Sequence, residues 1–136
     1  MQTLSVRTGS RTQFLDVTAQ VRAAVKKSGV TSGVCMLFVP HTTAGITINE
    51  NADPDVTRDI QMELNKVIPF DDGYAHTEGN SAAHIKSSLV GCQMNVFVEK
   101  GDLVLGTWQG IYFCEFDGPR TRKLYVKTLT TSDKTP

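Results

Sequence analysis

Apolar and polar residues follow two different periods along this chain, one typical of strands and one typical of helices. Alternation, or a short run that is apolar throughout, predicts strands over residues 3–8, 34–39, 46–49, 92–99, 103–116 and 120–130. The run Val34–Val39 has no polar face, so we expect it at the centre of a sheet. Turns are predicted at residues 100–102 and 117–119, where glycine stands beside charged residues or proline.

Two longer helices are predicted by apolar residues that recur every three or four positions. The first begins after Asp16 and ends at Gly29, a residue type that commonly terminates helices. The second begins at Asp53-Pro54, where a capping carboxylate precedes a proline in the first turn, and it ends at Pro69. Its apolar positions form the most regular helical pattern in the chain.

A short helix is predicted over residues 82–90, with Asn80 or Ser81 as its cap, after a polar loop at residues 70–79. Helices in the middle of the chain and strands towards its end predict an α+β fold. We therefore expect a single domain over residues 1–136. Its mixed, largely antiparallel sheet would be barrel-like, with two longer helices and one short helix.

Composition limits the classes of protein to which the chain can belong. It has 136 residues, of which 40% are hydrophobic and 21% charged, which suits one compact domain. It is too short for a (β/α)₈ barrel of roughly 200 residues or more. The 14 basic and 14 acidic residues balance, so we expect no nucleic-acid binding. The basic residues near the C-terminus alternate with other types and are interpreted as the exposed face of a strand; they are Arg120, Arg122, Lys123, Lys127 and Lys134.

The cysteines and the N-terminus provide evidence on the cellular compartment of the protein. Cys35, Cys92 and Cys114 are widely spaced among apolar neighbours, which favours free thiols in a core and a reducing compartment. The N-terminal residues lack the layout of a secretion signal. The longest apolar run is about a third of a membrane-spanning helix. We therefore expect a soluble cytoplasmic protein with no membrane partner.

Three histidines are the candidate centre of the chemistry. His41, His76 and His84 each lie at a break in the pattern or in a short capped segment. Three imidazoles suit a catalytic divalent metal with an open coordination position, and they also suit proton transfer near neutral pH. No H-x-x-x-H pair fixes two of them on one helix face. The alternative is that they are scattered loop residues that never meet.

Polar residues near these histidines provide candidate ligand contacts. Asn49 and Glu50 close a predicted strand just before a helix N-terminus, where anions and polar ligands are often bound. Asn80 and Ser81 place backbone N–H groups at the start of the short helix, which is a weak signal for a phosphate site. Lys86 adds positive charge to that segment.

Two further segments carry candidate binding residues. Trp108 is the only tryptophan and is flanked by Gly106 and Gly110, and glycine within a strand pattern often marks a close backbone approach. The tryptophan is interpreted as a core or interface anchor or, alternatively, as a stacking surface for a flat heterocycle. The turn near the C-terminus holds Asp117 and Arg120, and an arginine at such a rim suits bidentate phosphate binding.

Several segments resemble the motifs of the YjbQ family. They are Pro40–Asn51 followed by Asp53-Pro54-Asp55, His76–Lys86, Gly106–Ile111 and Glu115–Arg120. The likeness spans nearly the whole chain, and the motifs stand in the right order. That family is named for a secondary thiamine-phosphate synthase activity, and its members look like small α+β proteins that assemble as trimers. The resemblance implies that a homotrimer joins hydroxymethylpyrimidine diphosphate to a thiazole phosphate and releases pyrophosphate.

The same resemblance suggests roles for the candidate residues. His41, His76 and His84 would hold a divalent metal (Zn or Mg) or the diphosphate, and no organic cofactor is expected. Glu50, Glu78 or Asp117 would orient a histidine or act as a base. The expected substrate-binding residues are Thr42, Thr43, Asn49, Asn80, Ser81, Lys86, Trp108, Gln109 and Arg120.

Two other functional classes stay open. A metal-dependent hydrolase of a small phosphorylated or acyl substrate would also use three histidines and a nearby glutamate. A non-catalytic trimeric protein that binds a small phosphorylated or heterocyclic metabolite would need the same pocket without a base.

Overall fold

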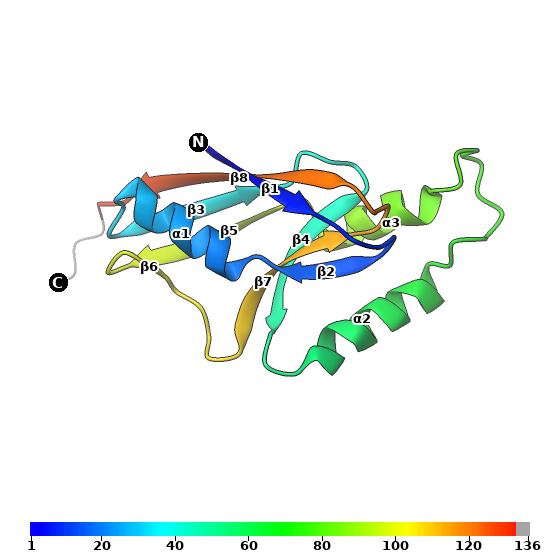
Figure 1. The fold of residues 1–136 in the computed structure, drawn as a ribbon, viewed down its shortest axis with the longest axis horizontal. Helices are drawn as coiled ribbons and strands as arrows, with labels where there is room; N and C mark the ends of the chain where they lie inside the picture. The colour runs from blue at the N-terminus through cyan, green and yellow to red at the C-terminus, as the bar shows by residue number, and fades with distance from the viewer. Residues whose placement is uncertain (133–136) are drawn as a thin grey trace.

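The computed structural model describes residues 1–132 and shows an α+β fold of two sheets and three helices (Figure 1). In chain order the elements are β1 (Gln2–Arg7), β2 (Gln13–Asp16), α1 (Thr18–Ser28), β3 (Gly33–Phe38), β4 (Ala44–Glu50), α2 (Pro54–Val67), α3 (Ser81–Val90), β5 (Gln93–Glu99), β6 (Asp102–Leu103), β7 (Gln109–Glu115) and β8 (Thr121–Thr130). The predicted fold class is confirmed. Lys134, part of the predicted basic segment, lies outside the described residues.

The strands form a five-stranded sheet in the order β1-β8-β3-β5-β6 and a three-stranded sheet in the order β2-β7-β4. Every pairing between described strands is antiparallel. Helix α1 and the inner faces of both sheets enclose the main core. Its members include Val21, Val25, Cys35, Leu37, Ile111, Phe113, Leu124 and Val126. Burial of this apolar surface is the main favourable contribution to folding.

Strand β7 is the middle strand of the three-stranded sheet and is buried on both faces because each face packs in an apolar cluster. Ile111 and Phe113 face the main core. Tyr112 and Cys114 face a second apolar cluster on the side of α3. Side chains alternate across a strand, so Glu115 follows Ile111 and Phe113 to the inner side, at the end of the main core. The candidate site lies next to this position.

The predicted helices are all present. Gly29 ends α1 in the left-handed conformation, with φ of 74°. Asp53 caps α2 by accepting a hydrogen bond from the backbone N–H of Asp55 at 2.9 Å. No residue of α2 is fully buried, and Met62 and Val67 are 59% and 69% exposed. Helix α2 is therefore regular in sequence but only lightly packed against the rest of the chain.

The strand predictions miss one strand and are wrong about another. The strand β2, which pairs with β7, is not predicted from the sequence. Residues 103–116 do not form one strand, because the segment 104–108 separates β6 from β7. Strand β6 pairs with β5 in the larger sheet, whereas β7 pairs with β2 and β4 in the smaller one. The chain must leave one sheet to enter the other, so a continuous strand is impossible here.

Two burial predictions are also corrected. Cys35 and Cys114 are buried free thiols as expected, but Cys92 is exposed. Arg122 does not lie on the exposed face of its strand, since it is only 2% exposed. It shares the inner face of β8 with Leu124 and Val126, which are also buried.

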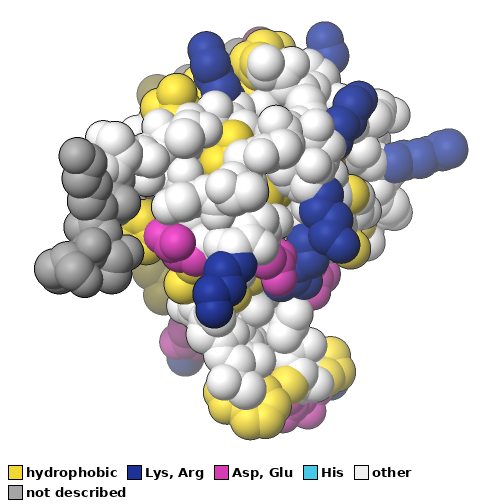
Figure 2. Space-filling view, turned by 90° about the vertical axis from the view of Figure 1, so that its left-hand side faces the viewer, with side chains coloured by type: hydrophobic (Ala, Val, Ile, Leu, Met, Phe, Trp, Pro, Cys, Tyr) yellow, Lys and Arg dark blue, Asp and Glu magenta, His cyan; other side chains and the backbone are white. Residues whose placement is uncertain are grey.

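The outer surface carries charges of both signs. Figure 2 shows Lys and Arg side chains next to Asp and Glu side chains on one face, with uncharged surface around these groups. Hydrophobic side chains reach the surface at the projecting lower lobe, where Figure 1 places the loop before β7 and the turn into α2. Within residues 1–132, no helix is long and apolar enough to span a membrane.

Candidate functional site

Two groups of predicted site residues lie at opposite ends of the β4–β7 pair, and the others lie on α3 and in the loop before it. The two strands are paired from Ala44 opposite Glu115 to Glu50 opposite Gln109. At about 3.3 Å per residue, these ends are roughly 20 Å apart. One end is continuous with His41, Thr42, Thr43, Asp117 and Arg120. The other end holds Asn49, Glu50, Trp108 and Gln109. Within one chain the structure does not bring these two groups together.

Two hollows adjoin the end of the pair where Glu115 lies. Both are lined by His41, Thr42 and Cys92. The first continues onto α3, where His84 lines it. The second reaches the start of β8, where Arg120 and Arg122 line it. We call these two adjoining hollows together the His41 cleft; its lining includes His41, Thr42, His84, Cys92, Arg120 and Arg122.

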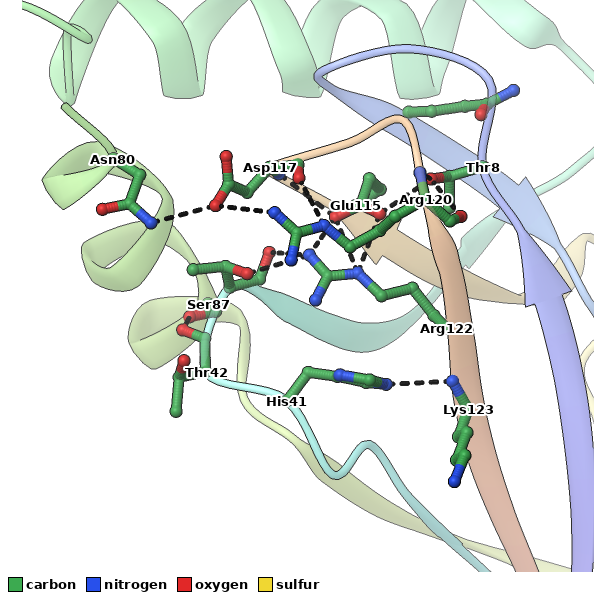
Figure 3. Close-up of polar contacts among 12 residues, drawn as sticks. Thr8, His41, Thr42, Asn80, Ser87, Glu115, Asp117, Arg120, Arg122 and Lys123 are labelled. Atoms are coloured by element: carbon green, nitrogen blue, oxygen red, sulfur yellow. Dashed lines mark hydrogen bonds and ion pairs between the residues drawn. The ribbon is translucent and has the colours of Figure 1, made fainter. Parts of the chain in front are cut away.

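His41 is held in its neutral form. Its Nε2 accepts a hydrogen bond of 2.9 Å from the backbone N–H of Lys123 (Figure 3). An imidazole that accepts at Nε2 carries its proton on Nδ1. Burial lowers the pKa of His41, and the positive charge of Arg122 lowers it further. While this bond holds, Nε2 is not available as a metal ligand.

A buried ion pair lies beside the cleft. The guanidinium of Arg122 donates from Nε to Glu115 Oε1 at 2.8 Å, and its Nη2 pairs with Glu115 Oε2 (Figure 3). Nη2 also donates to the hydroxyl of Thr43 at 2.8 Å. Thr8 donates to Glu115 Oε1 at 2.8 Å, and the backbone N–H of Asp117 donates to Oε2 at 3.1 Å. The pair therefore joins the residue after β1, strands β7 and β8, and the segment before β4.

These contacts keep Glu115 ionised. Burial by itself raises the pKa of Glu115, but hydrogen bonds from Arg122 and Thr8 outweigh it, and the pKa lies below its usual value. Neither Glu115 nor Arg122 belongs to the site predicted from sequence. The available signal is the alternation of β8, in which Arg122 occupies the same parity as Leu124 and Val126.

Three of the predicted residues meet at the rim of the cleft. Asp117 Oδ2 accepts a hydrogen bond of 2.9 Å from the side-chain amide of Asn80 (Figure 3). The same oxygen lies 3.2 Å from Arg120 Nη2, and Arg120 Nε donates to the backbone carbonyl of Asp117. Asn80 Oδ1 and Ser81 Oγ are buried with no hydrogen-bond partner among the described residues. Asn80 does not cap α3 with its side chain, contrary to one of the two predicted caps.

His84 of α3 also contacts the third histidine, His76. The rings of His76 and His84 meet edge to face, with centroids 5.4 Å apart. With Tyr74 and Ser81 they line a further hollow, so His84 stands between the two hollows that hold His41 and His76. Glu78 is exposed in the same loop as His76.

The expected metal does not fit this arrangement within one chain. Among residues 1–132, no group of three or more His, Cys, Asp or Glu side chains is placed to hold a metal ion. His41 uses its Nε2 to accept from Lys123. The three histidines thus share a region of the molecule, but they do not form one ligand set.

Lys86 points away from the cleft. Its side chain is fully buried, and its ammonium donates to Asn65 Oδ1 and lies 4.0 Å from the ring centroid of Phe70. Burial lowers the pKa of Lys86, and the nearby charge of Arg11 adds to this effect. The lysine therefore connects α3 to α2 and to the loop that follows α2.

The opposite end of the β4–β7 pair is exposed. Trp108 is 62% exposed and is not a core anchor of this chain. Its backbone carbonyl accepts from the N–H of Asn51 at 2.9 Å. Gln109 accepts from the N–H of Gly106, and the carbonyl of Glu50 accepts from Tyr112. These contacts hold the loop to the strand ends and leave the indole in solvent.

Comparisons with known proteins identify the family. Residues 2–131 match the family model described as UPF0047 protein YjbQ-like. The UPF0047 protein YugU of Bacillus subtilis is 53% identical to this chain, over 95% of this chain and 98% of its own length. A UPF0047 protein of Methanocaldococcus jannaschii is 52% identical over 91% of this chain and 90% of its own length.

Solved structures agree with the fold. One crystal structure, from Clostridium acetobutylicum, is described as an uncharacterized conserved protein of the YjbQ/UPF0047 family. Its sequence is 57% identical to this chain, and the two folds superpose with a TM-score of 0.93 over 95% of this chain and 100% of the Clostridium chain. A YbjQ-like protein of unknown function from Sulfolobus solfataricus is 33% identical with a TM-score of 0.91, covering 96% of both chains. Because the family model covers nearly the whole sequence and the folds coincide, this chain belongs to the UPF0047 (YjbQ-like) family, a family of unknown function.

Proposed function

We propose that this chain is an enzyme of the thiamine-phosphate synthase type. It joins hydroxymethylpyrimidine diphosphate to a thiazole phosphate and releases pyrophosphate. The observation that carries the proposal is the His41 cleft, in which one hollow lined by His41 and His84 adjoins another lined by His41, Arg120 and Arg122. Such a hollow suits a small substrate with phosphate groups. The resemblance of the sequence motifs supplies the particular reaction.

The proposed reaction needs stabilisation of negative charge. The thiazole nitrogen forms a bond to the methylene carbon of the pyrimidine, while the bond from that carbon to the diphosphate oxygen breaks. Charge accumulates on the departing pyrophosphate, so N–H donors and cations placed beside it lower the barrier. His84 would donate to the leaving oxygen, and Arg120 at the rim would approach the phosphates. Asp117 would orient Arg120, with which it is paired.

No step of the proposal is assigned to a metal, because the three histidines do not form a ligand set within one chain. We also propose, from the family resemblance, that the active form is a homotrimer. The outward face of the five-stranded sheet carries exposed Phe38, Phe97 and Leu129, which is consistent with coverage by another copy. Size-exclusion chromatography with light scattering should give three times the 14.9 kDa mass of one chain.

The test is a synthase assay with purified protein. The two substrates are incubated with and without added Mg²⁺, and thiamine phosphate is quantified by chromatography. His84→Ala should abolish product formation without changing the light-scattering mass or the thermal unfolding. Lys66→Ala, an exposed change on α2, is the matched control and should keep the wild-type rate. Unchanged turnover in His84→Ala removes the site assignment.

The assay also separates the two alternative classes. Release of inorganic phosphate or of an acid from model phosphate or acyl esters, with no thiamine phosphate formed, would replace the synthase by a hydrolase. Tight binding of either substrate with no product over a long incubation would replace it by a non-catalytic binding protein. Both results would contradict the proposed function.

A further inference from the structure

Arg122 combines deep burial with access to the His41 cleft. The side chain is 3% exposed, yet it lines the hollow that also contains His41 and Arg120. Its hydrogen bonds to Glu115 and Thr43 use only Nε and Nη2. Within residues 1–132, its other terminal nitrogen, Nη1, makes no hydrogen bond. In Figure 3 the guanidinium lies between Glu115 and the segment that carries His41 and Thr42.

The segment 41–43 lines the same hollow, and its backbone donors are not used inside the protein. Its carbonyl groups are directed into the protein, where that of Thr42 accepts from Ser87 and that of Thr43 accepts from Phe116 and Arg122. The backbone N–H groups of residues 41–43 have no acceptor among the described residues. Consecutive N–H groups without internal acceptors are the donors with which proteins hold oxyanions.

We propose that Arg122 and the backbone N–H groups of residues 41–43 bind a phosphate group in the His41 cleft, with Glu115 as the positioning residue of the guanidinium. The ligand is a phosphate ester or diphosphate, and in this respect the inference rests on the proposed function. Both carboxylate oxygens of Glu115 are occupied by Arg122, Thr8 and the N–H of Asp117, so the carboxylate does not face the bound anion.

This assignment differs from the one expected from sequence. Arg120 makes two contacts with Asp117, one to the side chain and one to the backbone. Its guanidinium is half-exposed and has a carboxylate as its nearest charge. Glu115 holds the guanidinium of Arg122 in place. The N–H groups of Arg122 Nη1 can therefore bind a ligand without rearrangement. A preorganised donor loses less conformational entropy when the ligand binds.

The experiment uses the full chain and inorganic pyrophosphate as the probe. Affinity is measured by isothermal titration calorimetry. The binding position is measured from the amide signals of the ¹⁵N-labelled wild-type protein. The amide signals of residues 41–43 should shift on titration. Arg122→Lys keeps the charge but loses the planar fork, and should weaken binding about ten-fold. Glu115→Gln should weaken it by a smaller factor, because the guanidinium loses its charged anchor.

Lys127→Gln is the matched control. It removes one positive charge from the same strand, on the outward face away from the cleft, and should change the affinity less than about two-fold while light scattering gives the wild-type mass. Circular dichroism and denaturant unfolding check that each variant is folded. If Arg122→Lys does not fold, the double variant Glu115→Gln/Arg122→Gln keeps a neutral hydrogen-bonded pair. The same loss of binding is expected of it.

The outcomes separate this inference from the proposed function. Absence of pyrophosphate binding, unshifted amide signals at residues 41–43, or unchanged affinity in the Arg122 variants would overturn the phosphate site even if the protein makes thiamine phosphate. Arg122-dependent binding without synthase turnover would support the phosphate site and contradict the synthase.

Discussion

The two ends of the β4–β7 pair hold similar residue types under opposite conditions. At one end Glu115 is fully buried, and its carboxylate accepts hydrogen bonds from Thr8 and Arg122. At the other end Glu50 is only partly buried, and Trp108 is exposed. A charge removed from water must be paired, whereas an exposed one is solvated at little cost. The Glu115 end is therefore constrained by its partners, and the Trp108 end tolerates change.

Removing one partner of the buried pair should have the largest effect. Arg122→Met leaves the Glu115 carboxylate buried without its cation, which should lower the free energy of unfolding by about 3–5 kcal/mol. Urea denaturation at neutral pH measures this loss. The double variant Glu115→Leu/Arg122→Met removes both charges and should recover most of the stability. A loss below about 1 kcal/mol in the single variant would show that the pair is solvated.

Two glycines allow the same change to be made at both ends. A Cβ on Gly118 would lie 2.4 Å from the carbonyl oxygen of Ser10 and 2.8 Å from Thr8 Oγ1, inside the buried network. A Cβ on Gly110 would lie 2.6 Å from the amide nitrogen and 2.8 Å from the Cβ of Asn51, so this exposed residue, outside the buried network, would have to shift. Gly118→Ala should cost about 1–3 kcal/mol and Gly110→Ala less. If thermal unfolding shows a larger destabilisation for Gly110→Ala than for Gly118→Ala, the comparison of the two ends is wrong.

Replacing the exposed indole should change little within one chain. Trp108→Ala is expected to alter the free energy of unfolding by at most about 0.5 kcal/mol. It should leave pyrophosphate affinity unchanged, because Trp108 lies at the far end of the strand pair. Calorimetric titration and urea denaturation measure both quantities. Weaker pyrophosphate binding in this variant would mean that another copy of the chain brings its Trp108 end to the cleft.

The smallest expected effect is a pH dependence from His41. Burial and the charge of Arg122 lower the pKa of His41 below its usual 6.5. The unfolded chain therefore binds a proton more readily than the folded one, so stability falls as the pH drops from about 6.5 towards the folded-state pKa. Urea denaturation between pH 7.5 and pH 5.5 measures this decline. His41→Gln keeps an acceptor for the N–H of Lys123, and an equal decline in that variant would exclude His41 as the source.

Local patterns predicted much of the fold. The apolar spacing and the Asp53-Pro54 start predicted α2, and Gly29 marked the end of α1. The short strand β2 was not predictable in the same way, because its four residues acquire strand geometry only by pairing with β7. The regularity of α2 also did not predict its burial, since that depends on what packs against it.

The candidate site was predictable in part. The segments around His41 and the Asp117–Arg120 turn do adjoin one cleft, and Asn80 reaches Asp117 from α3. Trp108 belongs to another end of the molecule, and Glu115 and Arg122 were absent from the prediction. Their pairing joins β7 and β8, which belong to different sheets, through a network that includes Thr8, 107 positions from Glu115.

Periodicity and turn chemistry, which act between near neighbours in the chain, define the helices, most of the strands and the apolar face of β8. They do not define β2, the break between β6 and β7, or the partners of a buried side chain. Arg122 shares the inner face of β8 with Leu124, but only the packing of the two sheets around one core brings it to Glu115 of β7. Which charges are buried, and which partners they meet, was decided by the tertiary structure. Burial is a property of surfaces brought together from distant parts of the chain.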